Sequence, residues 1–99
     1  MSTKKKYIFR SPEAGVFYGE MVDELTETRI VKIKNVRQIW YWEGAATLME
    51  LSKYGTSKPN KCKFTVTIDE IIITNVSEII PCTKEAISSI DSVKEWREE

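Results

Sequence analysis

The residues best suited to chemistry in this chain gather in two short segments near its middle. The first, at 38–46, reads Gln-Ile-Trp-Tyr-Trp-Glu-Gly-Ala-Ala and places three large aromatic rings directly before a run of small residues. The second, at 58–63, reads Lys-Pro-Asn-Lys-Cys-Lys and carries three lysines. Aromatic rings stack on flat ligands, and lysines attract anions. Together the two segments predict a pocket for a flat, negatively charged molecule such as a nucleotide.

The consecutive rings of Trp40, Tyr41 and Trp42 are the first part of that prediction. Side chains alternate along a strand, so Trp40 and Trp42 would share one face and Tyr41 would project to the other. One set of rings could then fill the core while the other meets a ligand or a second subunit. The alternative is that all three rings form core or dimer contacts, because aromatic residues dominate both.

Gly44, Ala45 and Ala46 open a predicted helix, and no residue at 43–45 is a good side-chain cap. The first N–H groups of a helix have no partner within it, so an anion can accept hydrogen bonds from them. Alternatively water binds these groups, Gly44 caps the helix weakly, or the small side chains let the helix pack close to a strand. The pattern matches neither the phosphate-binding P-loop nor the dinucleotide fingerprint.

Cationic side chains complete the predicted site. Lys58, Lys61 and Lys63 lie in a predicted loop, where they would contact phosphates, and Asn60 would hydrogen-bond to a base edge or close a turn. The alternative is a solvated loop whose lysines protect an edge strand. Arg37 precedes the aromatic rings, and it would pair with an acidic residue, stack on a ring or bind a phosphate.

Composition excludes much enzymology. The chain has no histidine, which removes catalytic triads, cysteine–histidine pairs and imidazole metal sites. Its two cysteines, Cys62 and Cys82, fit no metal motif, and we expect both to be reduced, buried and structural. We therefore expect no enzyme, no cofactor and no metal. The basic start is followed by no long apolar stretch, and no run approaches the roughly 20 apolar residues that span a bilayer, so we expect a cytoplasmic protein without membrane contact.

Charges are segregated along the chain although the net charge is zero. Residues 28–63 hold eight basic and two acidic side chains, whereas residues 64–99 hold three basic and eight acidic ones. One interpretation is that these segments attract each other within the fold or across subunits. The other is that the basic segment faces an anionic partner.

Periodicity predicts one α+β domain over 1–99, with a basic arm at 1–6 and a tail that frays at 95–99, although Trp96 could dock. We expect a small, curved, mostly antiparallel sheet or barrel of five to six strands, with two helices and the middle helix across one end. Gly19 predicts a bulge or a close backbone approach, and Gly55 ends the first helix. Thr83 caps the second helix. The predicted strands are 7–10, 16–22, 29–34, 64–68, 71–74 and 77–80, the predicted helix is 44–54, and 69–70 is a predicted turn.

A resemblance rests on four of these segments. They read Ala-Gly-Val-Phe-Tyr-Gly at 14–19, Val-Arg-Gln-Ile-Trp-Tyr-Trp-Glu-Gly-Ala-Ala at 36–46, Gly-Thr-Ser-Lys-Pro-Asn-Lys-Cys-Lys-Phe at 55–64 and Glu-Ile-Ile-Pro-Cys-Thr at 78–83. Over most of residues 7–90 the chain resembles small bacteriophage and prophage proteins grouped as a domain of unknown function. The resemblance implies a phage origin and the bacterial cytoplasm, and it carries no catalytic role. Small phage proteins often oppose host defence by binding a defence protein or by sequestering a nucleotide signal; this is an analogy of size and context.

We therefore expect a non-enzymatic homo-oligomer that binds a nucleotide-type ligand in a pocket between subunits. Aromatic rings would stack on bases, cations would meet phosphates, and small residues would offer backbone donors; the set is Arg37, Trp40, Tyr41, Trp42, Gly44, Ala45, Ala46, Lys58, Asn60, Lys61 and Lys63. The main alternative is a protein-binding inhibitor of a host defence factor, which would use residues 69–99 or the aromatic patch. Single-stranded nucleic acid is a weaker alternative, because the net charge is zero and the last third is acidic.

Overall fold

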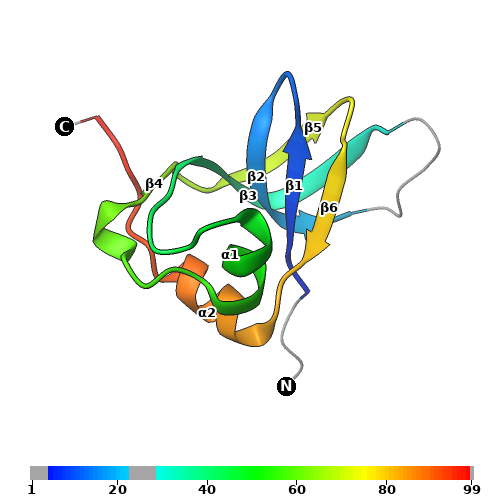
Figure 1. Cartoon of the computed structure of the whole chain (residues 1–99). Coiled ribbons are helices and arrows are strands. Elements are labelled where there is room, and N and C mark those ends of the chain that lie inside the picture. Colours follow the sequence, from blue (N-terminus) through cyan, green and yellow to red (C-terminus); the bar gives the residue numbers. More distant parts are fainter. Residues whose placement is uncertain (1–4, 23–28, 99) are drawn as a thin grey trace.

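The computed structural model describes residues 5–22 and 29–98, and the structural statements below concern those residues. The strands form one curved, unclosed sheet with both helices packed on one side of it (Figure 1). This confirms the predicted α+β fold. The elements are β1 (Tyr7–Ser11), β2 (Gly15–Met21), β3 (Val31–Tyr41), α1 (Leu48–Tyr54), the 3-10 turn η1 (Pro59–Lys61), β4 (Lys63–Phe64), β5 (Ile68–Ile73), β6 (Glu78–Pro81) and α2 (Lys84–Asp91).

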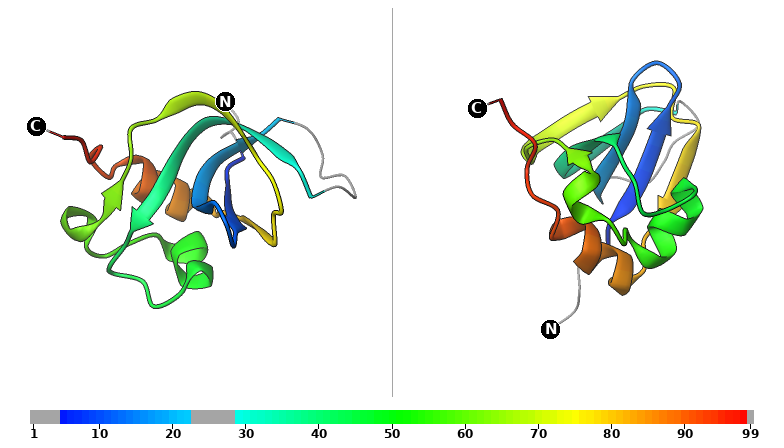
Figure 2. Two further views of the ribbon diagram at one scale, coloured as in Figure 1. Left: turned by 90° about the horizontal axis from the view of Figure 1, so that it is seen from above. Right: turned by 60° about the vertical axis from the view of Figure 1, so that its left-hand side comes forward.

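The sheet curls because a short connection joins its two edges. The strand order is β4-β3-β2-β1-β6, and β5 pairs with the first half of β3, so β5 and β6 lie on opposite edges. Only residues 74–77 link them. Ile73 and Glu78 are five residue steps apart, which reach at most about 17 Å, whereas the four strand spacings between these edges would measure about 19 Å in a flat sheet. The edges must therefore approach each other, and Figure 2 shows the resulting curl.

Alternation along the strands divides the interior into two cores. On the face covered by the helices, which we call the outer face, the buried residues are Ile8, Tyr18, Ile39, Leu51, Phe64, Ala86, Ile90 and Val93. On the inner face, which lies within the curl, they are Phe9, Phe17, Val31, Ile33, Val36, Ile73 and Val76. Neighbours in sequence such as Ile8 and Phe9 fall into different cores, as the two-residue period of a strand requires.

Gly19 allows β2 and β3 to approach closely. The β2–β3 register shifts between Tyr18 and Glu20. A Cβ atom at Gly19 would lie 2.7 Å from Ile33 Cγ2 and 2.8 Å from the Lys34 carbonyl oxygen. The prediction of a bulge or a close approach at this glycine is therefore confirmed.

The predicted strand 64–68 and the predicted turn 69–70 are wrong. β4 ends at Phe64, and β5 begins at Ile68 and runs through 69–70. Thr65 causes the interruption, because its hydroxyl oxygen accepts a hydrogen bond from the Gln38 N–H (2.8 Å) and so competes with backbone pairing. Val66 and Ile68, which alternate with polar residues in the predicted strand, are 38% and 45% exposed. The chain thus pairs with β3 through β4, leaves it, and pairs with it again through β5. β3 itself is longer than the predicted strand 29–34.

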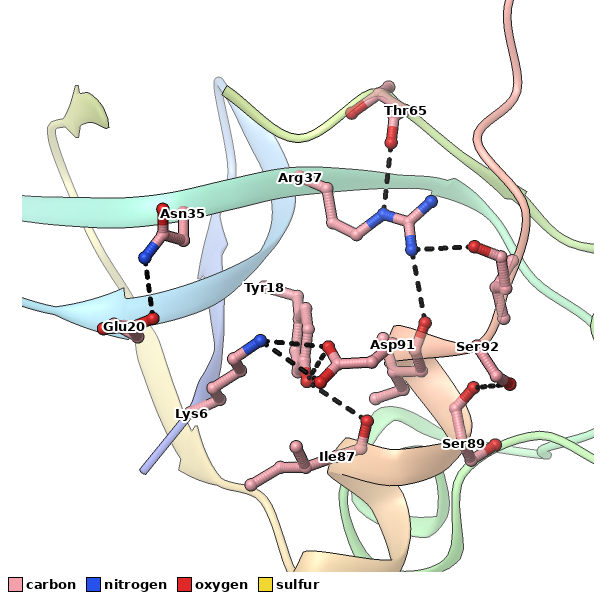
Figure 3. Close-up of polar contacts among 12 residues, drawn as sticks. Lys6, Tyr18, Glu20, Asn35, Arg37, Thr65, Ile87, Ser89, Asp91 and Ser92 are labelled. Atoms are coloured by element: carbon pink, nitrogen blue, oxygen red, sulfur yellow. Dashed lines mark hydrogen bonds and ion pairs between the residues drawn. The ribbon is translucent and has the colours of Figure 1, made fainter. Parts of the chain in front are cut away.

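The Arg37 side chain fills the place where the chain departs, and it is only 5% exposed (Figure 3). Its Nε donates to the Thr65 carbonyl oxygen (3.1 Å). Its two terminal nitrogens donate to four further carbonyl oxygens at 3.0–3.5 Å, those of Phe64, Ile90, Val93 and Lys94. All five N–H donors of the guanidinium are therefore used. Burial lowers the pKa of Arg37, and the last carbonyls of α2 provide the negative end of the helix dipole for its charge.

The tail after α2 follows β4 as an extra edge. The Trp96 N–H donates to the Phe64 carbonyl oxygen (2.8 Å), and Glu95 Oε2 accepts a hydrogen bond from the Thr67 N–H (3.2 Å). Residues 95 and 96, which were predicted to fray, are therefore held by hydrogen bonds. At the other end, Lys6 of the predicted basic arm pairs with Asp91 at 3.0 Å, whereas residues 1–4 lie outside the described part of the chain.

We expect Arg37→Met to lower the free energy of unfolding by about 3 kcal/mol, because buried carbonyls left without donors cost roughly 1–3 kcal/mol each. Arg37→Lys should restore only part of this loss. The lysine ammonium can still donate to some of the carbonyls, but it has fewer donors than the guanidinium and all of them are on one nitrogen. Urea unfolding followed by tryptophan fluorescence measures both. Arg10→Met is the control, because Arg10 forms an exposed ion pair with Glu78; such pairs contribute about 1 kcal/mol or less. Equal losses at the two positions would contradict the role given to Arg37.

Candidate functional site

Two tryptophans and a lysine form an exposed surface at the end of β3. Trp40 is 60% exposed. Its ring stacks on that of Trp96, with the centroids 6.0 Å apart and the planes at 21°. The Lys63 ammonium lies 5.4 Å from the centroid of Trp96. We call these three residues the tryptophan platform. It combines flat apolar surface with a positive charge, which suits a flat anion.

The platform joins three segments that are distant in sequence. Trp40 comes from β3 and Lys63 from β4, and Phe64 bridges to Glu95 in parallel, which brings Trp96 beside them. Phe64 belongs to the outer core, so Lys63 next to it projects to the opposite face of the sheet. Trp96 was not among the predicted site residues. The available signal was one large ring within an otherwise polar and charged tail.

The lysine-rich segment, which contains η1, leads directly into β4, the strand that carries Lys63 (Figure 1). Lys58, Asn60 and Lys61 are exposed in and next to η1. Within the described residues, neither these two lysines nor Lys63 forms an ion pair. In contrast, Lys32 pairs with Glu70 at 3.7 Å, so attraction within the fold explains part of the charge segregation. The lysines at 58, 61 and 63 remain available to an external anion.

Gly44 fastens this lysine loop to the turn after β3. Its carbonyl oxygen accepts a hydrogen bond from the Ser57 N–H (3.3 Å), and the Thr56 hydroxyl donates to the Glu43 carbonyl oxygen. A Cβ atom at Gly44 would lie 2.5 Å from the Lys58 nitrogen, and φ is +88° there. Only glycine fits such a position without strain. The two segments singled out from sequence are therefore joined, and Gly44 has a structural role in joining them.

The prediction that the helix begins at Gly44 is wrong. α1 begins at Leu48, and its cap is Thr47, whose hydroxyl oxygen accepts from the Glu50 N–H (3.1 Å). The Glu50 carboxylate in turn accepts from the Ala46 N–H (2.7 Å). The signal that marks this start is the capping box Thr-x-x-Glu at 47–50. The predicted end of the helix at Gly55 is confirmed, because the Gly55 N–H donates to the Leu51 carbonyl oxygen (2.9 Å).

The other predicted aromatic and cationic residues do not join the platform. Trp42 packs against the outer core, and its Nε1 donates to the Ala45 carbonyl oxygen (3.0 Å). Strict alternation ends here because the β3–β4 register shifts between Ile39 and Tyr41. The exposed Tyr41 donates its hydroxyl to Glu43 (2.7 Å), and this bond raises the pKa of Tyr41. Arg37 has no donor left for a phosphate.

Two hollows accompany these residues. One, of about 230 Å³, opens at the break between β4 and β5; it is lined by Phe17, Val36, Arg37, Gln38, Thr65, Val66, Ile68 and Ile71. The other, of about 410 Å³, lies beside α1 and is lined by Trp42 with Arg10, Val16, Thr47, Leu48, Met49, Glu78 and Ile80. Trp42 therefore lines a hollow on the outer face, whereas Trp40 belongs to the platform. Of these two hollows, the first shares a strand face with the platform; a further hollow of about 390 Å³ is lined by Trp96, Arg97 and Glu98.

A polar cluster between α2 and the sheet offers little reactivity (Figure 3). The Tyr18 hydroxyl donates to Asp91 Oδ1 (2.8 Å), which also accepts from Lys6 (3.0 Å). Burial, and then the bond to Asp91, raise the pKa of Tyr18 well above its usual value. Burial and Asp91 raise the pKa of Cys82 to about 12. Both groups are therefore protonated at neutral pH, and the Tyr18 hydroxyl ties α2 to the sheet through Asp91 and the Ile87 carbonyl oxygen. Cys62 and Cys82, which were both predicted to be buried, are half-buried.

The described residues contain no group of three or more His, Cys, Asp or Glu placed to hold a metal ion. None of the described helices combines the length and apolarity needed to cross a membrane.

Comparison with known proteins places most of the chain in one family. A family model described as a domain of unknown function, DUF6948, matches residues 4–90. The match includes Trp40 and Lys63 and ends before Trp96. No curated protein and no solved structure matches the chain.

We expect the Cys82 thiol to resist alkylation in the folded protein. With a pKa of about 12, it is almost fully protonated at pH 8, and only the thiolate reacts readily. The raised pKa also stabilises the fold below pH 9, the ordinary value for this thiol, and that contribution is lost as the pH rises towards 12. Iodoacetamide labelling of a Cys62→Ser variant, followed by mass spectrometry, should be slow at pH 8 and fast in urea. Equally fast labelling in both conditions would contradict the burial of this group.

Proposed function

The chain belongs to the DUF6948 family, a domain of unknown function, and from the geometry of its surface we propose that it binds a flat, anionic, nucleotide-type ligand without converting it. The ligand would stack on the tryptophan platform and direct its anionic group towards the lysines. This keeps the ligand class expected from sequence and moves the site to the rings that are exposed. The residues that carry the proposal are Trp40, Trp96 and Lys63, with Lys58, Asn60 and Lys61 at the margin.

The single observation behind this proposal is the exposed stack of Trp40 on Trp96. Large apolar side chains gain free energy when they leave water, so an indole ring that is 60% exposed suggests a surface completed by a partner. The contact with Trp96 restricts the motion of the Trp40 ring before a ligand binds. Less side-chain motion is then lost on binding. Stacking of a base on such a ring contributes about 1–3 kcal/mol.

The charge distribution favours an anion over a neutral ring. The Lys63 ammonium lies beside the stack, 5.4 Å from the centroid of Trp96. Lys61 and Lys58 follow on the exposed η1 turn, and neither is neutralised by another described side chain. Lysine binds phosphate as a mobile point charge, so the three can adapt to one or several phosphates. Because Arg37 is buried, these lysines supply the positive charge that the proposal requires.

Binding without conversion fits the side chains at this surface. The sequence has no histidine, and the buried Tyr18 and the half-buried Cys82 lie in a different part of the fold. A ligand on the platform of one chain would keep one side open to water, so we include in the proposal a second copy that encloses it. The resemblance to phage proteins extends this to sequestration of a host signal in the bacterial cytoplasm.

A second candidate is a protein-binding inhibitor of a host defence factor. The same exposed tryptophans favour it, because tryptophan is enriched among the residues that dominate protein interfaces. The two candidates differ in size of ligand and in dependence on the lysines. A protein partner would need Trp40 and much of the surrounding surface, whereas a nucleotide would need Trp40 and the cations.

Calorimetric titration with a panel of cyclic and linear nucleotides tests the proposal. We expect at least one to bind, and Trp40→Ala to weaken it by about tenfold or more, since one stacked base contributes roughly 1–3 kcal/mol. Lys63→Ala should weaken it by a smaller factor and reduce its salt dependence. Met49→Ala is the matched control, because Met49 is exposed at 69% and belongs to α1, away from the platform. No binding by any nucleotide, or binding that ignores both substitutions, would overturn the proposal.

A further inference from the structure

We infer that the ligand carries a short apolar arm, which enters the hollow at the break between β4 and β5. This inference rests on the proposed function and narrows its ligand class. The hollow of about 230 Å³ is lined mainly by apolar side chains, among them Phe17, Val36, Val66, Ile68 and Ile71. An apolar cavity of about 150 Å³ is sufficient to bind benzene. One phenyl ring or branched alkyl group would therefore fit.

The hollow exists because the chain leaves β3 for three residues. β4 ends at Phe64 and β5 begins at Ile68, and between them Thr65 binds both backbone groups of Gln38. The Thr67 N–H turns to the Glu95 carboxylate in the tail, at 3.2 Å. The inner core is therefore open at this point instead of being covered by a continuous edge strand. Mouths of curled sheets are common places for small ligands.

Two segments of the chain link the hollow to the platform. Along β3, Val36, Gln38 and Trp40 occupy alternate positions, so they follow one another on the inner face at about 7 Å per pair. Along the tail, Glu95, which holds Thr67 at the rim, directly precedes Trp96. A ligand stacked on Trp40 would therefore have the hollow within reach of one short substituent.

Charge and polarity follow one order across this surface. Along the chain, Lys58, Lys61 and Lys63 come before Phe64, whereas the lining of the hollow at Thr65 and Val66 comes after it. Along β3, Gln38 of the hollow comes before Trp40 of the flat apolar stack. Val66 and Ile68 line the hollow and are 38% and 45% exposed, so an apolar arm would cover surface that the chain leaves in water. The matching molecule is a flat aromatic anion whose apolar arm projects from the edge remote from the anionic group.

Two synthetic probes separate the arm from the flat anion. 2-Anilinonaphthalene-6-sulfonate has a flat ring with the sulfonate and the phenyl arm at opposite ends, and naphthalene-2-sulfonate lacks the arm. We expect calorimetry to give an affinity about tenfold higher for the anilino probe, because the phenyl ring is removed from water. The isomer 1-anilinonaphthalene-8-sulfonate, with adjacent substituents, should lose most of this advantage. Trp40→Ala should weaken both 2,6-type and unsubstituted probes.

Substitutions of residues that line the hollow test whether the apolar arm binds there. Val66→Asn with Ile68→Asn makes the lining polar at two exposed positions, so the fold should persist, which urea unfolding checks. This variant should bring the two probes to within about threefold of each other while naphthalene-2-sulfonate binds as before. Ile72→Asn is the matched control, because Ile72 is exposed on the same strand and does not line the hollow; it should leave the tenfold preference intact.

The outcomes distinguish this inference from the proposed function. Equal affinity of the two naphthalene probes for the unchanged protein, with both weakened by Trp40→Ala, would overturn the arm and leave the platform standing. A preference that survives Val66→Asn with Ile68→Asn would also overturn it, since the arm would then lie elsewhere. Failure of the probes together with the nucleotide panel would remove both.

Discussion

The fold depends on one buried cation whose five hydrogen bonds all go to backbone carbonyl oxygens. The guanidinium of Arg37 has five N–H groups, and carbonyl oxygens from the β4–β5 link, the end of α2 and the tail accept all of them. Burying a charge is expensive unless its hydrogen bonds are satisfied. The three segments must therefore hold fixed positions relative to β3, and that requirement joins the last ten residues to the middle of the sheet.

The candidate site follows from the same arrangement. The tail brings Trp96 beside Trp40, and the departure of Thr65 from the ladder opens the hollow next to them. The three consecutive aromatic residues at 40–42 have different roles in the structure. Trp42 completes the outer core, Tyr41 bonds to a neighbouring carboxylate, and Trp40 alone of the three reaches the platform. A flat surface, three unneutralised lysines and an apolar opening thus lie at one end of the sheet.

The features that the sequence predicted correctly are those that depend on interactions between nearby residues. The two-residue alternation, the bulge at Gly19 and the helix end at Gly55 all depend on neighbours in sequence or on one close contact, and the structure confirms them. The strand break at Thr65 was missed because the flanking alternation is regular, and only the pairing with β3 reveals the competing hydroxyl. The burial of Arg37 and the position of Trp96 rest on contacts between segments more than 50 residues apart, for which a single sequence has no pattern.

The tail also bears on where this domain ends. The family match stops at residue 90, yet two acceptors of the buried cation, at Val93 and Lys94, and one ring of the platform come afterwards. The stretch common to the family is therefore shorter than the cooperative unit of this chain. A protein truncated at residue 90 would lack two of the backbone carbonyl oxygens that accept hydrogen bonds from Arg37 in the full chain. It would therefore expose the guanidinium charge. A relative that diverges beyond it would have to satisfy the same cation by other means, and would present a different surface at the end of β3.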